Sequence, residues 1–199
     1  MTRSRSLGGV LAGVLIALAP AVAEAHVAVQ TLELFAGALH PWMNLESGLT
    51  LSGLTLWLAQ AARPTDLVPF VASGGCVLAG VALGLWMDVP GPPPFAYGIA
   101  LVAGSLPCLN LKIPRRAGLL ALGSMASIAG YFAGVDAAAD AQTPLYFLAG
   151  AFSGALVLPL SVAALVANCD WSPVRIGVRV LGSWISAISL MLLALTLRG

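Results

Sequence analysis

Apolar residues gather along this chain in long blocks, each close to the ~20 residues that a membrane-spanning helix needs. Short polar or proline-rich segments separate the blocks. Thr143-Pro144 and Ser172-Pro173 are typical helix starts, with a hydroxyl residue before the proline. The pattern predicts six spans, at about 45–62, 67–87, 95–111, 117–135, 145–167 and 176–197. The expected fold is all-α, a polytopic helical bundle in a membrane.

A separate apolar segment at the N-terminus has the pattern of a signal peptide. Two arginines precede the apolar run 7–22, which leads into Ala23-Glu24-Ala25, a small-x-small cleavage pattern. The alternative is an uncleaved first span, but the run is short and Pro20 interrupts it near its end. We therefore expect 1–25 to be a cleaved signal peptide and 26–199 to be a single six-span membrane domain.

Basic residues concentrate in alternate loops between the predicted spans. The loops on one side hold the basic residues Arg63, Lys112, Arg115, Arg116, Arg175 and Arg179. The loops on the other side hold Asp88, Asp136 and Asp140 and no lysine or arginine. By the positive-inside rule the basic side is cytoplasmic, which puts the mature N-terminus outside the inner (cytoplasmic) membrane. The predicted signal peptide independently agrees with this orientation.

The composition narrows the function classes. Hydrophobic residues make up 59% of the chain and charged residues 9%, whereas soluble domains carry about 25% charged residues. No basic run indicates a nucleic-acid partner, and no nucleophile elbow, phosphate loop or HExxH motif indicates an enzyme. The three cysteines are widely spaced, which favours neither a disulfide nor a thiolate metal site. The expected surroundings of the protein are the lipid bilayer.

Glycines recur at four-residue spacing in three of the predicted spans. The pairs are Gly80 and Gly84, Gly130 and Gly134, and Gly150 and Gly154. Small residues at this spacing let two helix backbones approach closely in lipid. The pattern fits either a homo-oligomer interface or internal packing of a compact bundle, and its presence in three different spans favours internal packing.

A histidine and a carboxylate lie where the first predicted span begins. A short amphipathic stretch, 27–40, leads to His40-Pro41, and Glu46 follows at the start of the span. Such groups are costly to keep at the mouth of a span, and imidazole with carboxylate suits borderline divalent cations. We expect Pro41 to break the helix and to turn His40 over the mouth of the next helix. The alternative is an interfacial His40 hydrogen-bonded to the backbone.

Two further residues complete the candidate metal ligands. Cleavage after Ala25 makes His26 the first residue of the mature chain. Its α-amino group and imidazole then form a chelating pair for a divalent transition metal. The alternative is a solvated histidine in a flexible tail. Asp136 lies with Asp140 in a predicted outer loop, where the alternative role for both is that of solvated loop acids.

The order of these features resembles the HupE/UreJ family of membrane proteins. The resemblance lies in a signal peptide that leaves an N-terminal histidine, G-x-x-H-P at 37–41, six spans, and the stretch RIGVRVLGSWISA at 175–187. It implies a secondary permease for nickel or cobalt that serves hydrogenase or urease assembly. Ni²⁺ or Co²⁺ would then be the transported substrate, with no firm cofactor.

The chain departs from the family's entrance motif, which is roughly H-P-x-x-G-x-D-H. His40 and Pro41 match it. Asn44, Glu46 and Ser47 stand at the positions of the glycine, the aspartate and the second histidine. A carboxylate is still present, as glutamate in place of aspartate, and one imidazole ligand is lost.

A second family motif, roughly H-G-x-E, falls on 133–136, where Asp136 keeps the carboxylate and an alanine replaces the histidine. The whole chain has two histidines, so a histidine-rich metal path is excluded. Two hypotheses follow. One is a divalent-metal permease with His26, His40, Glu46 and Asp136 as ligands. The other is a non-transporting membrane accessory or structural subunit that has lost its metal ligands and serves a partner complex.

Overall fold

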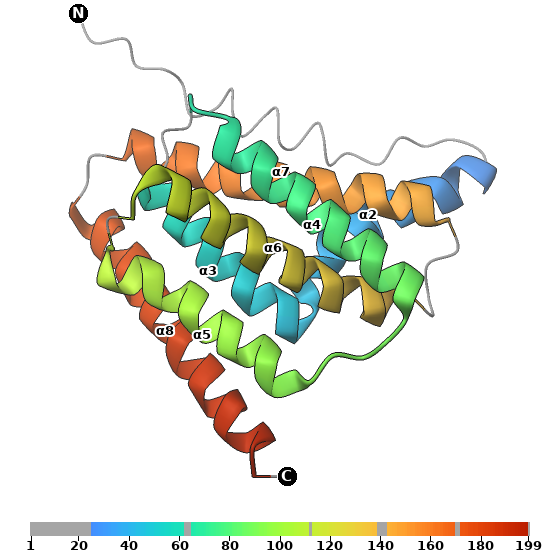
Figure 1. Cartoon of the computed structure of the whole chain (residues 1–199). Coiled ribbons are helices and arrows are strands. Elements are labelled where there is room, and N and C mark those ends of the chain that lie inside the picture. The colour runs from blue at the N-terminus through green and yellow to red at the C-terminus, as the bar shows by residue number, and fades with distance from the viewer. Residues whose placement is uncertain (1–24, 62–64, 112, 139–142, 170–171, 199) are drawn as a thin grey trace, which may run out of the picture.

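A computed structural model describes residues 25–61, 65–111, 113–138, 143–169 and 172–198, with side chains from Thr31 onward. These residues form seven helices and no strand (Figure 1). The helices are α2 (Ala25–Met43), α3 (Leu45–Ala61), α4 (Val68–Met87), α5 (Pro93–Leu109), α6 (Arg115–Ala137), α7 (Pro144–Asn168) and α8 (Ser172–Thr196). The predicted signal peptide lies outside the described residues except for Ala25.

Helices α3 to α8 coincide with the six predicted apolar blocks to within a few residues. Within the described part of the chain, four helical segments are long and apolar enough to cross a membrane, namely Val68–Met87, Arg115–Ala137, Pro144–Asn168 and Pro173–Thr196. Helix α5 is a shorter apolar helix of 17 residues, and α3 has the same length. The chain is thus a multi-pass membrane protein, and a crossing by all six helices is part of the proposal below.

Helix α3 occupies the middle of the bundle. It contacts α2, α5, α6, α7 and α8, while α4 packs chiefly on α6, α2 on α7, and α8 on α5 (Figure 1). Leu54 on α3, Phe70 and Val77 on α4, and Leu122 on α6 are almost completely buried in the shared core. Helix α8 lies at the edge and exposes large apolar side chains, as a helix that faces lipid would.

The spaced glycines bring helix backbones into contact inside the bundle. A Cβ atom on Gly130 or Gly134 of α6 would overlap the carbonyl oxygens of Val77 and Val81 on α4. Gly150 and Gly154 of α7 meet α2 in the same way, at the carbonyl oxygens of Leu34 and Ala38. The internal-packing interpretation of these glycines is therefore confirmed. Their main structural effect is to hold α6 against α4 and α2 against α7.

The segment before the first predicted span is itself a long helix, α2. The prediction that Pro41 breaks this helix is wrong, because Pro41 lies inside α2 and the chain leaves helical conformation only at Asn44. Proline removes one backbone hydrogen bond and crowds the turn before it. Here α2 ends two residues later, so the disturbance is confined to its last turn, which α7 supports.

Candidate functional site

One residue, Asn44, separates α2 from α3 and caps the second helix. Its backbone N–H donates to the carbonyl of His40 at 3.0 Å, which continues the pattern of α2. Its side-chain Oδ1 accepts the backbone N–H groups of Glu46 and Ser47, each at 3.0 Å. An asparagine that accepts from the second and third residues of a helix is an N-cap, and it satisfies donors that otherwise lack a partner.

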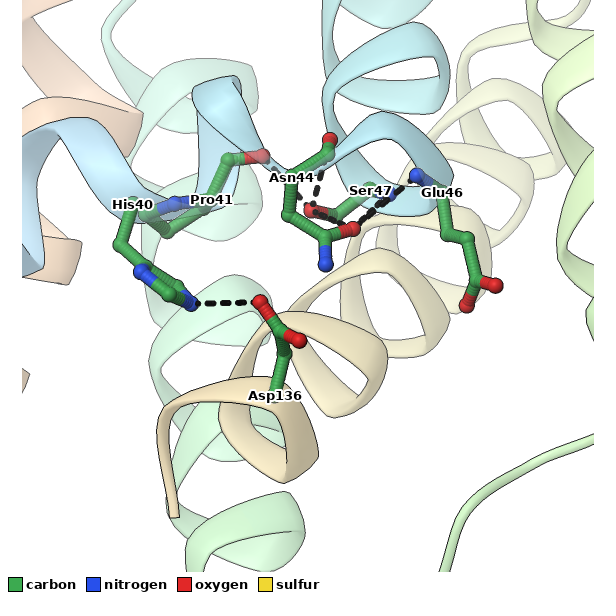
Figure 2. Close-up of polar contacts among 6 residues, drawn as sticks. All are labelled: His40, Pro41, Asn44, Glu46, Ser47 and Asp136. Carbon is green, nitrogen blue, oxygen red and sulfur yellow. Dashed lines mark hydrogen bonds and ion pairs between the residues drawn. The ribbon is translucent and has the colours of Figure 1, made fainter. Parts of the chain in front are cut away.

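Ser47 joins the two helices across this junction. Its hydroxyl donates to the carbonyl oxygen of Pro41 at 2.7 Å and lies 3.1 Å from Asn44 Oδ1 (Figure 2). The side chain is fully buried. Sequence reasoning treated Asn44 and Ser47 only as departures from the family's entrance motif. The structure gives them a shared structural role, which an asparagine directly before an apolar helix could have indicated.

His40 lies beside Asp136 although 96 positions separate them, since α6 runs back across the bundle to α2. His40 Nε2 is 3.2 Å from Asp136 Oδ2 (Figure 2). The nitrogen is buried and has no hydrogen-bond partner among the described residues, so this contact has the distance of an ion pair without hydrogen-bond alignment. The contact confirms neither role for His40, but the partner of Nε2 is a carboxylate and not the backbone.

The imidazole ring is also held from a third helix. Phe147 of α7 packs against it edge to face, with ring centroids 5.6 Å apart and an interplanar angle of 66°. Gly37, one turn earlier on α2, leaves room for the backbone of Phe147. The ring position is therefore fixed by α2 and α7, while α6 supplies the carboxylate. The side chain of His40 remains 26% exposed and that of Asp136 55% exposed, so the pair borders solvent while Nε2 itself is covered.

Asp136 is helical and does not lie in a loop as expected. Helix α6 continues through Ala137, beyond the predicted end at 135. The alanines that follow Asp136 favour helix extension, and the last turn of α6 then directs the carboxylate at His40. Asp140, its predicted companion, lies outside the described residues.

Glu46 is near this pair but not bonded to it. It lies in the first turn of α3, where the helix dipole favours a negative charge. Its carboxylate is close enough to Asp136 for the two negative charges to repel each other, and Tyr97 lies near it. Figure 2 shows it extending from the start of α3 on the other side of Asn44 from His40. Within the described ranges no three His, Cys, Asp or Glu side chains form a ready metal site.

The backbone of His26 lies in the first turn of α2, and its side chain is outside the described part. Fourteen residues of helix, at ~1.5 Å per residue, place its backbone about 21 Å from that of His40 along the axis. A metal bound at His26 would therefore occupy a separate position from the His40–Asp136 pair.

The bundle and its polar site define a helical multi-pass membrane protein with a histidine–carboxylate pair at one end. The family model described as HupE / UreJ protein matches residues 14–192, most of the chain. The protein therefore belongs to the HupE/UreJ family, and the predicted resemblance is confirmed. This is a family of transporter-like membrane proteins associated with nickel or cobalt transport and with urease or hydrogenase maturation. No curated protein and no solved structure matches the chain.

Proposed function

We propose that this protein is a secondary permease for a divalent transition metal, nickel or cobalt. It crosses the inner membrane six times with its mature N-terminus outside, and it supports metalloenzyme assembly. One observation carries the proposal: two distant helices, α2 and α6, bring His40 Nε2 and Asp136 Oδ2 to 3.2 Å at the start of the central helix. Family membership supports the same substrate class.

The spacing of the two ligand atoms suits a single cation. Metal–ligand distances for imidazole nitrogen and carboxylate oxygen are ~2.1 Å, so two such atoms at a right angle around one ion are about 3.0 Å apart. The observed 3.2 Å is close to that value. A cation would lie between the imidazole nitrogen and the carboxylate oxygen, and borderline ions such as Ni²⁺ and Co²⁺ accept this mixed nitrogen and oxygen set.

The small number of protein ligands suits transport. Two ligands leave most coordination positions to water, which gives weak binding, and a transported ion must leave its site as readily as it enters. Glu46, whose charge interacts with that of Asp136, provides a second carboxylate close to the pair. His26, about 21 Å away along α2, would act as an earlier binding point in the approach to the pair.

Uptake of nickel and cobalt by cells that express the protein tests this function. We expect His40→Ala and Asp136→Asn each to lower accumulation at least tenfold, and Glu46→Gln to lower it less. Asp88→Asn is the matched control, because Asp88 is an exposed acid on the same predicted side, at the end of α4. Accumulation that stays normal in both His40→Ala and Asp136→Asn, at equal protein level in the membrane, would disprove the permease.

The second candidate is the non-transporting accessory subunit. The observation in its favour is that the Ser47 hydroxyl hydrogen-bonds to Asn44 Oδ1 and to the Pro41 carbonyl oxygen. In the family motif the position of Ser47 holds a second histidine, a further ligand. This function predicts a stable partner protein in a mild-detergent pulldown and no change in cellular metal. A protein that purifies alone and binds Ni²⁺ would exclude it.

A further inference from the structure

A cavity lies at the opposite end of α3 and α6 from the His40–Asp136 pair. It has a volume of about 690 Å³ and lies where α3 ends and where α4 and α6 begin, three helix ends that Figure 1 shows close together. Its walls are mainly apolar, formed by Leu58, Ile113, Leu119 and Leu122. Asp66 and Arg115 are its charged lining residues.

The rim of the cavity holds an arginine that is incompletely bonded. Arg115 donates from one terminal nitrogen to Asp66 Oδ2 at 2.9 Å and makes no other side-chain hydrogen bond within the described ranges. An arginine has five donors, so most of them are available to a ligand. Asp66 is shared, because its Oδ1 also accepts the backbone N–H of Val68 at 3.3 Å.

The start of α6 strengthens this positive charge. Arg115 and Arg116 occupy the first turn, where the helix dipole already favours an anion. Pro114 precedes them at the N-cap and provides no side-chain cap for the first N–H groups. Two cations at this end of a helix repel the dipole, and Asp66 is the only acid that the structure shows bonded to either of them. A bound anion would reduce the repulsion between these arginines and the positive end of the helix dipole.

The inner wall contains a polar group without a partner. Trp57 is 5% exposed and lines the cavity, and its indole N–H has no acceptor among the residues described. The Cζ2–Cη2 edge of its ring faces Gly118, whose missing side chain keeps that part of the wall open. Buried polar groups normally have partners, and an acceptor atom in the cavity beside Trp57 would supply one for the indole N–H.

The depth of the cavity points to lipid. The spans Val68–Met87 and Arg115–Ala137 both begin at the cavity, which places its rim at the level of the headgroups and its walls at the start of the hydrocarbon. We propose that this cavity binds one anionic phospholipid. The phosphate contacts Arg115 and the start of α6, a glycerol or ester oxygen accepts from Trp57, and an acyl chain lies along Ile113 and Leu119. Basic pockets between spans on the cytoplasmic side are suited to such headgroups.

The proposal predicts opposite effects on lipid binding for substitutions of the two members of the Asp66–Arg115 pair. Arg115→Gln removes the cation that binds phosphate and should weaken lipid binding about fivefold, the factor that corresponds to ~1 kcal/mol per arginine near anionic lipid. Asp66→Asn removes the competing carboxylate and should strengthen binding. If the pair only fastens α4 to α6, both variants break it and should behave alike.

The experiment uses the full mature chain in mild detergent and counts bound lipid by native mass spectrometry. The probes are phosphatidylglycerol, phosphatidylcholine and inorganic phosphate. The control is Arg175→Gln, an exposed arginine on α8 that lies on the same predicted side and outside the cavity. We expect one retained phosphatidylglycerol, little phosphatidylcholine, no competition from millimolar phosphate, and unchanged binding in the control. Trp57→Phe, which keeps an aromatic side chain but loses the pyrrole ring with its N–H, should shorten lipid retention.

Three results would overturn the inference. They are equal losses in Arg115→Gln and Arg175→Gln, weaker binding in Asp66→Asn, and full displacement of the lipid by inorganic phosphate, which would indicate a site for a free anion. None of them bears on metal uptake through His40, so this inference and the proposed permease can fail independently.

Discussion

The hydroxyl of Ser47 donates to the carbonyl oxygen of Pro41 at 2.7 Å and so bridges the one-residue gap between α2 and α3. Pro41 directly follows His40, so this bond fixes the backbone that presents the imidazole to Asp136. At the position of Ser47 the family motif has its second histidine. In this chain the residue at that position instead supports the backbone next to His40.

Removing this bridge should destabilise the fold and disturb the site. In Ser47→Ala the buried Pro41 carbonyl loses its side-chain partner, which costs about 1–3 kcal/mol. We expect a lower melting temperature in detergent and reduced metal uptake. Ser124→Ala is the control, since Ser124 is exposed and its hydroxyl bonds only within α6, to the carbonyl of Ala121 at 3.1 Å. Equal melting temperatures for the two variants would contradict a structural role of the Ser47 bridge.

The sequence predicted the helices well because each apolar block is long and ends at prolines or charges. The ends that it misplaced depend on contacts across the bundle. Pro41 was expected to end a helix, but α2 is held by its packing on α7 and continues to Met43. Asp136 was expected in a loop, but α6 extends past it to Ala137.

The site was only partly predictable for the same reason. His40, Glu46 and Asp136 stand out as polar residues at the ends of apolar blocks, and that is visible without coordinates. Which of them meet depends on how α6 returns across the bundle to α2. That path is set by the glycines at which α4 meets α6 and α2 meets α7. Their spacing predicts close helix contact, but not which helix is the partner.

His40 and Asp136 should act as one unit in binding metal. If His40 Nε2 and Asp136 Oδ2 hold the same cation, His40→Gln and Asp136→Asn will each weaken Ni²⁺ binding. The double variant will then bind Ni²⁺ only a little more weakly than the single variant with the lower affinity. Titration calorimetry on the purified mature protein gives the affinities. Strictly additive losses in binding free energy would show that the two residues bind separate ions, and no loss in either variant would place the metal elsewhere.

Gly134 should tolerate no side chain. A Cβ atom there would overlap the carbonyl oxygen of Val81, so Gly134→Ala must push α6 away from α4 or strain both backbones. Overpacking of this kind costs about 1–3 kcal/mol, and it would also shift Asp136, two residues later. Gly75→Ala on α4 is the matched control, because no atom lies within 4 Å of its Cβ position. We expect a lower melting temperature for Gly134→Ala alone, measured by thermal unfolding in detergent.

The predicted topology places both ends of the mature chain on the outer side, because six spans return the chain to the side where it began. Reporter fusions test this. An alkaline phosphatase fused after Arg198 should be active, and one fused after Asn110, in the basic loop between α5 and α6, should be inactive.

N-terminal sequencing of the purified protein should begin at His26, and Ala25→Leu should block that processing. An inactive fusion at Arg198 combined with correct cleavage would mean an odd number of crossings. The short helices α3 and α5, with 17 residues each, would then be the first to re-examine, since each is close to the shortest helix that spans the hydrocarbon.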